Sequence, residues 1–263
     1  MHAYAHRAFR RAGACVLRPF VAKIAAQRYN GCMKKRTLVF DFDMTLGYRS
    51  PMWTETVRLL LLRHNVFSTD EQVIPITHGD VYPWHFDGAA RAEFLRGKTW
   101  WQAVGGAIAD ELVLRGVCSR AVADAVAREL PGLFCDLRFW ELFPDTLPTL
   151  TALKDEGHTL VLLTNHIPEA RRIFEHLGVL PLFDRAVISS EQDVEKPDPR
   201  IWDLALDGFE RDGAVMIGDN YSTDIKGALA CGLQAILVRK PNDADYPLYS
   251  PTLEGIIPVL RQL

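Results

Sequence analysis

The sequence predicts an α/β fold: a doubly wound, Rossmann-like parallel sheet that carries an inserted α-helical cap. From residue 145 onward, short and fully apolar runs alternate with segments of helical spacing. Continuous apolar strands separated by helices are typical of a parallel sheet that is covered on both faces. Residues 52–138, which precede this array, show helical spacing and no buried-strand run. A chain of 263 residues suffices for one large domain with such an insertion.

The first strand is expected at Leu38–Phe40, preceded by Thr37, and it ends in paired acids. Asp41 and Asp43 follow the strand directly, and Thr45 adds a hydroxyl two residues further on. Two carboxylates about 4 Å apart repel each other by about 4 kcal/mol at an effective dielectric of roughly 20. Because a bound cation would offset this repulsion, the strand end predicts a metal site.

The inserted segment, residues 52–138, is predicted to form a helical cap. Its apolar residues recur at spacings of three and four, which is the period of a helix with one buried face. Helices are expected at Thr54–Arg63, Thr99–Arg115 and Ser119–Leu130, and an irregular loop at His78–Asp87. The tryptophans and histidines of this region either line a substrate pocket or pack between helices, and packing is favoured for Trp100 and Trp101: Trp84, Trp100, Trp101, Trp140, His78 and His85.

The remaining elements belong to the α/β core, which is expected to comprise residues 33–51 and 139–263. Gly157 and Gly178 mark the ends of two of its helices, as glycine commonly does. The expected helices are Thr146–Glu156, Pro168–Leu177, Pro199–Leu206 and Asp224–Ala230. The expected strands after the first are Thr159–Leu163, Ala186–Ile188, Ala214–Ile217 and Gln234–Val238, the last of the chain.

The first 32 residues form a basic extension that we leave out of the predicted fold. Residues 1–36 hold nine Lys and Arg and no Asp or Glu, whereas the rest holds 21 basic and 33 acidic residues, a net charge of −12. Three interpretations remain open: an organellar transit peptide, a basic arm for an acidic partner, or a segment upstream of a true start at Met33. The start at Met33 is favoured, since a compact domain would begin at Met33–Arg36.

The composition, with 48% apolar and 24% charged residues, is that of an ordinary globular protein. No apolar run reaches the roughly 18 residues that a membrane span requires, so no membrane span is expected. The five cysteines are scattered and form no C-x-x-C pair, which indicates reduced thiols and a cytoplasmic protein, or an organellar one if residues 1–32 are a transit peptide. We expect no nucleic-acid partner.

Polar side chains gather where the predicted strands end. Ligands bind at the carboxyl ends of the strands in a doubly wound sheet. This edge should therefore collect four acids, one lysine and one hydroxyl: Asp41, Asp43, Asp219, Asp224, Lys196 and Thr164. A donor set of oxygen atoms without His or Cys suits a hard cation such as Mg²⁺. A lysine and hydroxyls beside that ion suit a phosphoryl group, whose oxygens carry negative charge.

At this point the sequence resembles the haloacid dehalogenase-like hydrolases. Four motifs occur in the order of that family, each at a predicted strand end: Asp41-x-Asp43-x-Thr45, Thr164, Lys196-Pro197, and Gly218-Asp219-Asn220 followed by Asp224. The resemblance covers residues 36–240, and the inserted helices are similar to the helical cap of the family. One such motif alone would be weak, whereas four in order are specific.

The resemblance implies a role for each matching residue. Asp41 would be the nucleophile that forms an aspartyl-phosphate, and Asp43 the general acid and then the base. Thr45 would steady the loop, and Thr164, Asn165 and Lys196 would bind the phosphoryl group. Mg²⁺ would be held by Asp41, Asp43 through its backbone carbonyl, and Asp219, and Asp224 would either join these ligands or orient them.

The expected activity is therefore that of a Mg²⁺-dependent phosphatase acting on a small phosphorylated metabolite. A phosphomutase of the same mechanism is the nearest alternative, and a non-catalytic binding protein on this fold is a third. Asp43 favours attack on phosphorus over attack on carbon, since dehalogenases of the family need no acid there. Met44 departs from the glycine of many relatives and should alter how the loop folds. His166 is interpreted as a core or surface histidine, with a lesser possibility that it faces the substrate.

Overall fold

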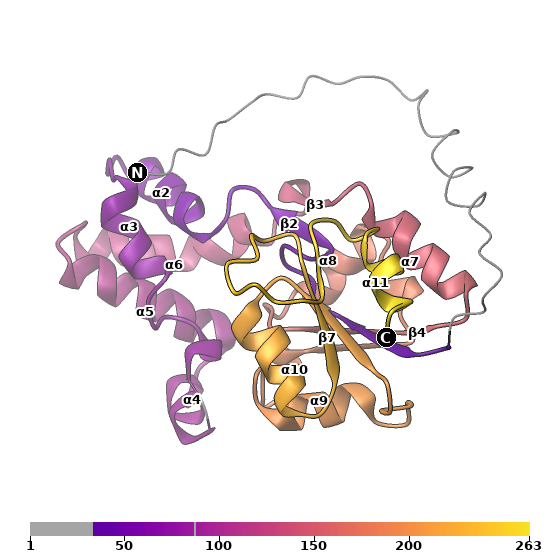
Figure 1. Cartoon of the computed structure of the whole chain (residues 1–263). Coiled ribbons are helices and arrows are strands. Elements are labelled where there is room, and N and C mark those ends of the chain that lie inside the picture. The colour runs from indigo at the N-terminus through magenta and orange to yellow at the C-terminus, as the bar shows by residue number, and fades with distance from the viewer. Residues whose placement is uncertain (1–33, 87) are drawn as a thin grey trace, which may run out of the picture. The chain divides into compact units, whose positions relative to one another are not determined.

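The structure is a computed structural model that describes residues 34–86 and 88–263 (Figure 1). The predicted basic extension, residues 1–32, lies outside the described residues. Within them, a six-stranded parallel sheet has the strand order β5-β4-β1-β6-β7-β8. The strands are β1 (Thr37–Phe40), β4 (Thr159–Thr164), β5 (Arg185–Ile188), β6 (Val215–Gly218), β7 (Gln234–Val238) and β8 (Tyr249–Ser250). The predicted doubly wound α/β fold is confirmed.

The strand order places the end of β1 at the point where the direction of winding reverses. After β1 the chain adds β4 and β5 on one side, and then returns to add β6 and β7 on the other. Ligands bind at such a switch point, because the loops that leave the two neighbouring strands diverge there. The residues that directly follow β1, β4 and β6 therefore share one crevice.

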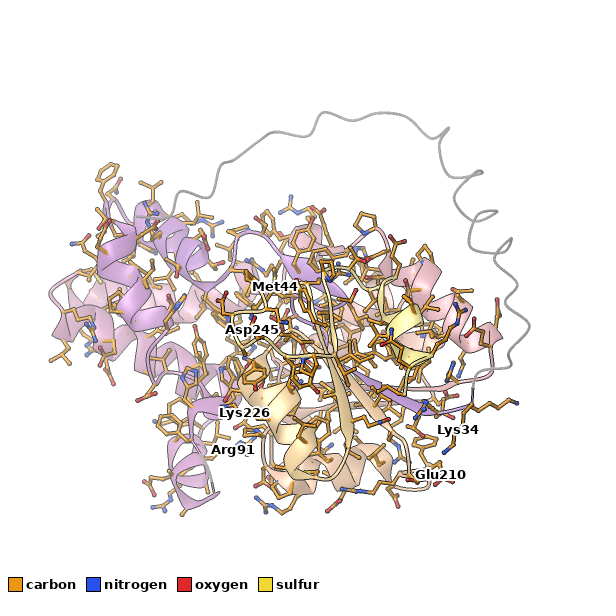
Figure 2. All side chains as sticks on the ribbon, viewed as in Figure 1. Lys34, Met44, Arg91, Glu210, Lys226 and Asp245 are labelled. Carbon is orange, nitrogen blue, oxygen red and sulfur yellow. The ribbon has the colours of Figure 1, made fainter. Side chains whose placement is uncertain are left out.

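The two faces of the sheet are covered by different helices. Figure 1 shows α7 (Thr146–Asp155) and α8 (Ala170–His176) on one side, and α9 (Pro199–Leu206) and α10 (Gly227–Ala230) on the other. On the α9 side, alternate strand residues such as Val39 pack against the fully buried Trp202. Side chains fill the space between helices and sheet throughout the described part (Figure 2). This packing holds the strand ends in fixed positions.

The segment between the first strand and the rest of the core is helical, as the spacing predicted. Its helices are α2 (Trp53–Arg63), α3 (Asp70–Thr77), α4 (Gly88–Leu95), α5 (Trp100–Leu114) and α6 (Arg120–Phe134). The predicted counterparts of α2, α5 and α6 are confirmed to within a few residues, whereas α3 and α4 were not predicted. The exact borders of the cap, 52 and 138, remain a prediction.

Four short elements correct the sequence-based prediction. The segment His78–Asp87 is not wholly irregular, because Pro83–His85 forms a 3₁₀ turn (η1). A two-stranded antiparallel ribbon joins β2 (Gly47–Arg49) to β3 (Trp140–Leu142), so the chain enters and leaves the helical segment side by side. The predicted strand Gln234–Val238 is β7, but it is not the last strand, because β8 follows it in the chain and pairs with it. Strands of two or three residues are too short for a periodic pattern to reveal.

Two remaining expectations concern thiols and membranes. Cys118, Cys135 and Cys231, the cysteines within the described residues, are free thiols. Across the same part of the chain, the helices are all too short or too polar to cross a bilayer.

The remaining short elements are the 3₁₀ turns η2 (Leu137–Phe139), η3 (Leu180–Leu182) and η4 (Ser189–Glu191), the π-helical η5 (Tyr221–Lys226) and α11 (Ile256–Leu260).

Candidate active site

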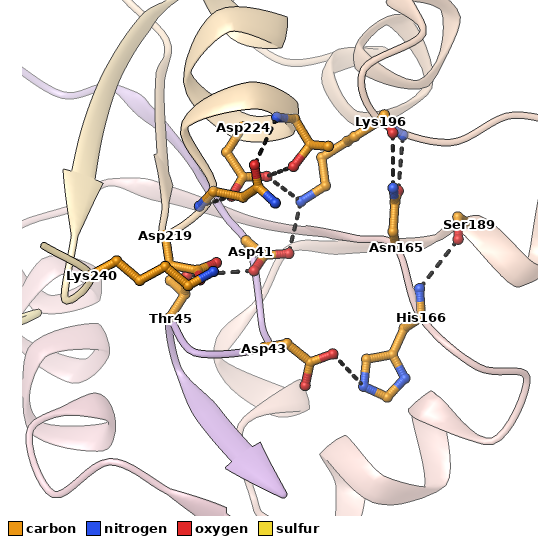
Figure 3. A network of polar contacts seen from close by, with 12 residues as sticks. Asp41, Asp43, Thr45, Asn165, His166, Ser189, Lys196, Asp219, Asp224 and Lys240 are labelled. Carbon is orange, nitrogen blue, oxygen red and sulfur yellow. Dashed lines mark hydrogen bonds and ion pairs between the residues drawn. The ribbon is translucent and has the colours of Figure 1, made fainter. Parts of the chain in front are cut away.

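Three carboxylates meet at the switch point. Asp41 follows β1, and its backbone N–H donates to the carbonyl of Ile217 in β6 at 3.0 Å, which fixes it between the two strands. Asp219 follows β6, and Asp224 lies on the π-helical turn η5 (Tyr221–Lys226). Each of the three acids offers an oxygen within 4.8 Å of the other two, and all three side chains are buried (Figure 3). The structure thus brings together three of the four acids expected to bind metal.

Asp224 reaches this cluster because of the local backbone after β6. Asn220 caps the turn, with its side-chain oxygen accepting from the N–H groups of Ser222 and Thr223. The N–H of Asn220 in turn donates to Asp224 Oδ2 at 3.0 Å. Gly218 leaves the room that is needed, because a Cβ there would lie 2.3 Å from Asp224 Oδ2. The sequence predicted a regular helix at 224–230, whereas the structure has a π turn before the short α10; such turns are frequent at functional sites.

Lys196 supplies the central positive charge. Its ammonium donates to Asp41 Oδ1 and to Asp224 Oδ1, both at 2.7 Å, and the side chain is almost fully buried. Asn165 does not point at the cluster. Its amide exchanges two hydrogen bonds of 2.9 Å with the backbone of Lys196, so it positions that residue. We therefore interpret Asn165 as a support of Lys196 and not as a direct phosphate ligand.

Burial and the neighbouring charges shift the pKa values of the site residues. Burial raises the pKa of Asp41 to about 7, although Lys196 acts in the opposite direction. Burial likewise raises the pKa of Asp219 to about 6, against the effect of Lys240. For Lys196, burial would lower the pKa, but the carboxylates of Asp224 and Asp41 raise it above its usual value. The carboxylates of the cluster thus keep Lys196 protonated despite its burial.

Lys240 is a member of the site that the sequence did not predict. It lies in the loop after β7, and its ammonium forms an ion pair with Asp219 Oδ2. Its neighbour Arg239 donates from Nε to the carbonyl of Thr45 at 2.7 Å and forms an ion pair with Asp145 at 2.7 Å. Neither residue falls in a recognisable motif, and the loop that carries them has no periodic pattern.

Asp43 stands apart from the metal cluster. Its carboxylate faces His166, with 3.5 Å between Oδ2 and the ring Nε2 (Figure 3). The side chain is not among the three that converge as a candidate metal site, so any contribution of Asp43 to the metal falls to its backbone carbonyl. The two acids of the opening motif therefore occupy different environments.

The two threonines of the predicted site differ in their contacts. Thr45 Oγ1 donates to Asp41 Oδ2 at 3.4 Å, a long bond that helps to orient the Asp41 carboxylate. Thr164 Oγ1, at the end of β4, is buried, and no hydrogen-bond partner for it is found within the described residues. A buried hydroxyl without a partner costs about 1–3 kcal/mol, and a phosphoryl oxygen would satisfy it.

Met44, where many relatives have glycine, has a backbone φ of 58°. This is the left-handed region, which glycine adopts without strain and which costs other residues roughly 1–2 kcal/mol. The turn keeps its shape through the Met44 N–H, which donates to the carbonyl of Gly47 at 2.8 Å. The Met44 side chain, labelled in Figure 2, is exposed at this turn.

The donor set fits a hard divalent cation. Three buried carboxylates face two ammonium groups, so the cluster carries excess negative charge: Asp41, Asp219 and Asp224 against Lys196 and Lys240. Oxygen donors of this kind are those that Mg²⁺ prefers. The chemistry of the donors therefore suits such an ion.

Comparison with known proteins places this geometry in a family. The sequence model of the haloacid dehalogenase-like hydrolases matches residues 35–232. Since that match covers most of the chain, the protein belongs to the haloacid dehalogenase-like hydrolases. The resemblance inferred from the four motifs is thereby confirmed.

Individual proteins with known names are similar to parts of this chain. The chain is 35% identical over 133 residues to a phosphoserine phosphatase from Thermus thermophilus, a match of 48% of this chain and 53% of that protein. It thus spans about half the length of that relative. It is 29% identical over 175 residues to haloacid dehalogenase-like hydrolase domain-containing protein 3 of Danio rerio, covering 66% of this chain and 71% of that one. The solved HAD-hydrolase YfnB from Bacillus subtilis, bound to magnesium, superimposes with a TM-score of 0.63 at 21% identity, covering 86% of this chain and 99% of that one, and shows the shared fold.

Proposed function

We propose that the protein is a Mg²⁺-dependent phosphatase that hydrolyses a small phosphorylated metabolite through an aspartyl-phosphate on Asp41. The observation that carries this proposal is the separation of the two acids after β1. Asp41 is bonded to Lys196 beside two further carboxylates, whereas Asp43 lies outside that cluster. Relatives named as phosphatases support the same conclusion.

Asp41 is the proposed nucleophile. Its carboxylate oxygen attacks phosphorus, the bond to the leaving oxygen breaks, and the phosphoryl group is held on Asp41. Lys196 and the hydroxyl of Thr164 neutralise the phosphoryl oxygens. Asp41, Asp219 and Asp224 would hold Mg²⁺, whose charge would keep the Asp41 carboxylate ionised and offset the negative charge of the phosphoryl group. Lys240 partly neutralises Asp219 through their ion pair.

Asp43 is the proposed proton carrier. It gives its proton to the leaving oxygen as the first bond breaks, and it takes a proton from water as water attacks the aspartyl-phosphate. The second step releases phosphate, restores Asp41 and returns Asp43 to its protonated form. General acid–base catalysis of this kind contributes about 100- to 10,000-fold in rate.

The experiment is a screen of residues 33–263 against phosphorylated sugars, nucleotides and small acids with Mg²⁺. Wild-type protein should release phosphate from at least one compound, and Asp41→Asn should lose this activity while its circular dichroism spectrum is unchanged. An inactive wild type, or an active Asp41→Asn variant, would contradict the proposal. Transfer of labelled phosphate between two positions of a sugar would identify a phosphomutase, and chloride release from 2-chloro acids a dehalogenase.

We further propose that the protein works in a reducing compartment, the cytoplasm or an organelle. The free thiols of Cys118, Cys135 and Cys231 support this proposal. We also propose that the protein binds a small phosphorylated molecule and not a nucleic acid. The net negative charge of residues 37–263 supports this, because nucleic acids are themselves negatively charged.

A further inference from the structure

His166 lies at the carboxyl end of β4, two residues beyond Thr164, and its side chain is 2% exposed. Aromatic rings surround it on several sides. The ring centroids of Trp140 and Phe174 lie 5.2 Å from that of His166, and the centroid of Phe42 lies at 5.8 Å. These contacts confine the imidazole to one position beside the loop that carries Asp43.

The polar atoms of His166 are not satisfied by ordinary structural partners. Within the described residues, neither ring nitrogen has a hydrogen-bond partner, and neither has Asp43 Oδ1. In the described part of the chain, the Asp43 carboxylate is the charged group that forms an ion pair with the ring, at 3.5 Å from Nε2. A buried polar group without a partner costs about 1–3 kcal/mol, which a phenylalanine in the same aromatic box would avoid. A role in packing alone therefore does not explain the histidine.

The backbone also holds His166 in place. Its N–H donates to Ser189 Oγ at 3.2 Å, a contact between the ends of β4 and β5. Phe42, which touches the ring, stands between Asp41 and Asp43 in the chain. The imidazole is thus fixed to the same strand ends as the two acids (Figure 3).

We propose that His166 is a positioning residue for Asp43, holding its carboxyl group in the orientation from which it protonates the leaving oxygen and later accepts a proton from water. This inference rests on the proposed function. His166 itself neither gains nor loses a proton in either step, because the proton passes between Asp43 and the leaving oxygen or water. Contacts of this kind are commonly long without substrate and shorten when substrate binds.

The test uses variants that separate packing from hydrogen bonding. His166→Phe keeps the aromatic box and removes both nitrogens, whereas His166→Gln keeps an N–H donor of similar reach. Release of the leaving group is measured in a single turnover for two substrates, an alkyl phosphate found active in the screen and 4-nitrophenyl phosphate. An alkoxide needs its proton to leave and a nitrophenolate does not, so only the first reaction depends strongly on Asp43.

We expect His166→Phe to slow alkyl phosphate cleavage by roughly 10- to 100-fold, with little effect on 4-nitrophenyl phosphate. His166→Gln should recover part of the loss, and in an Asp43→Asn background His166→Phe should have little further effect. Equal losses on both substrates, no loss, no recovery by glutamine, or a full further loss in the Asp43→Asn background would each overturn the proposal. His166→Leu replaces the phenylalanine variant if that variant does not fold. An inactive wild type would instead contradict the proposed function.

Discussion

The carboxylate of Asp224 reaches the site because residue 218 has no side chain. A Cβ on Gly218 would approach Asp224 Oδ2 to 2.3 Å, and real Cβ atoms do not come so close. Either the π turn or the strand end would have to move. Asp224 also accepts hydrogen bonds from the Lys196 ammonium and from the N–H of Asn220. Its displacement would therefore disturb both the proposed metal ligands and Lys196, the proposed phosphate-binding residue.

Gly218→Ala is therefore expected to weaken Mg²⁺ binding by about 10- to 100-fold, the usual effect of disturbing groups that orient metal ligands. Isothermal titration with Mg²⁺ and the Mg²⁺ dependence of phosphate release measure this. Gly132→Ala is the matched control, since Gly132 is exposed on α6 and an added Cβ meets nothing within 4 Å. Unchanged Mg²⁺ affinity in Gly218→Ala would show that the site tolerates the shift.

At the scale of residues, the site residues that occur in motifs were predictable from the sequence, and those outside motifs were not. Asp41, Lys196 and Asp219 were identifiable because each follows a predicted strand end. Lys240 and Arg239 were not, because no local pattern shows where the side chain of a loop residue will lie. For His166 the sequence favours a core or surface position and leaves open that it faces the substrate, since its contact with Asp43 depends on how β1 and β4 pair.

At the scale of elements, α4 is tied to the core by a buried ion pair. Arg91 Nε donates to Glu195 Oε1 at 3.0 Å, and its Nη2 donates to the carbonyl of Gln192 at 3.0 Å. Both charged side chains are less than a tenth exposed. Glu195 directly precedes Lys196, so this contact joins the helical segment to the loop that carries the proposed phosphate-binding lysine. The sequence did not predict α4, whose docking depends on a partner 104 residues away.

Removing Arg91 should destabilise the protein, because Glu195 is then a buried charge without its partner. We expect Arg91→Met to lower the free energy of unfolding on the order of 3 kcal/mol at pH 8. Urea unfolding measures this. Arg96→Met is the control, since Arg96 follows the same helix, is 75% exposed and pairs with the exposed Glu93; its effect should stay below about 1 kcal/mol. Equal effects of the two substitutions would contradict the prediction that the Arg91–Glu195 ion pair stabilises the fold.

Glu195 should also make stability depend on pH. Burial raises its pKa from 4.5 to about 7, with Arg91 opposing the rise. The folded state therefore holds a proton that the unfolded state releases between these values. The stabilising contribution is complete below pH 4.5 and is lost as the pH rises to about 7.

Glu195→Gln should flatten the pH dependence of stability. The fall in unfolding free energy between pH 5 and pH 7.5 should shrink, by an amount bounded at roughly 3 kcal/mol. Urea unfolding at the two pH values without Mg²⁺ measures the change. Glu93→Gln, at an exposed position of α4, is the control and should leave the slope unaltered. A variant of Glu195 with the wild-type slope would assign the pH dependence to other groups.

At the scale of the whole molecule, the metal cluster is a source of repulsion that ligand binding relieves. Mg²⁺ at about 100 times its dissociation constant should stabilise the folded state by about 2.7 kcal/mol, a rise of several degrees in Tm. Differential scanning calorimetry with and without Mg²⁺ measures this. Asp219→Asn should abolish the shift and should itself melt no lower than wild type without metal. A Tm that is insensitive to Mg²⁺ would contradict the assigned ligands.

The core architecture was predictable from the sequence, because each long strand is a continuous apolar run that stops at a polar motif. The run Thr159–Leu163, for example, became β4 with one more residue. The ribbon of β2 and β3 and the edge strand β8 were not predictable. They are two or three residues long, and they form because distant segments such as Gly47 and Leu142 meet.

The central claim is that Asp41 carries the phosphoryl group during turnover. The most direct measurement is to mix the protein with a ³²P-labelled substrate from the screen and Mg²⁺, stop the reaction with acid within milliseconds, and identify the labelled peptide. We predict label on the peptide that contains Asp41, release of that label by hydroxylamine, and no label in Asp41→Asn. Phosphate release by an active enzyme with no labelled Asp41 peptide at any quench time, or with label on a different residue, would contradict the proposed mechanism.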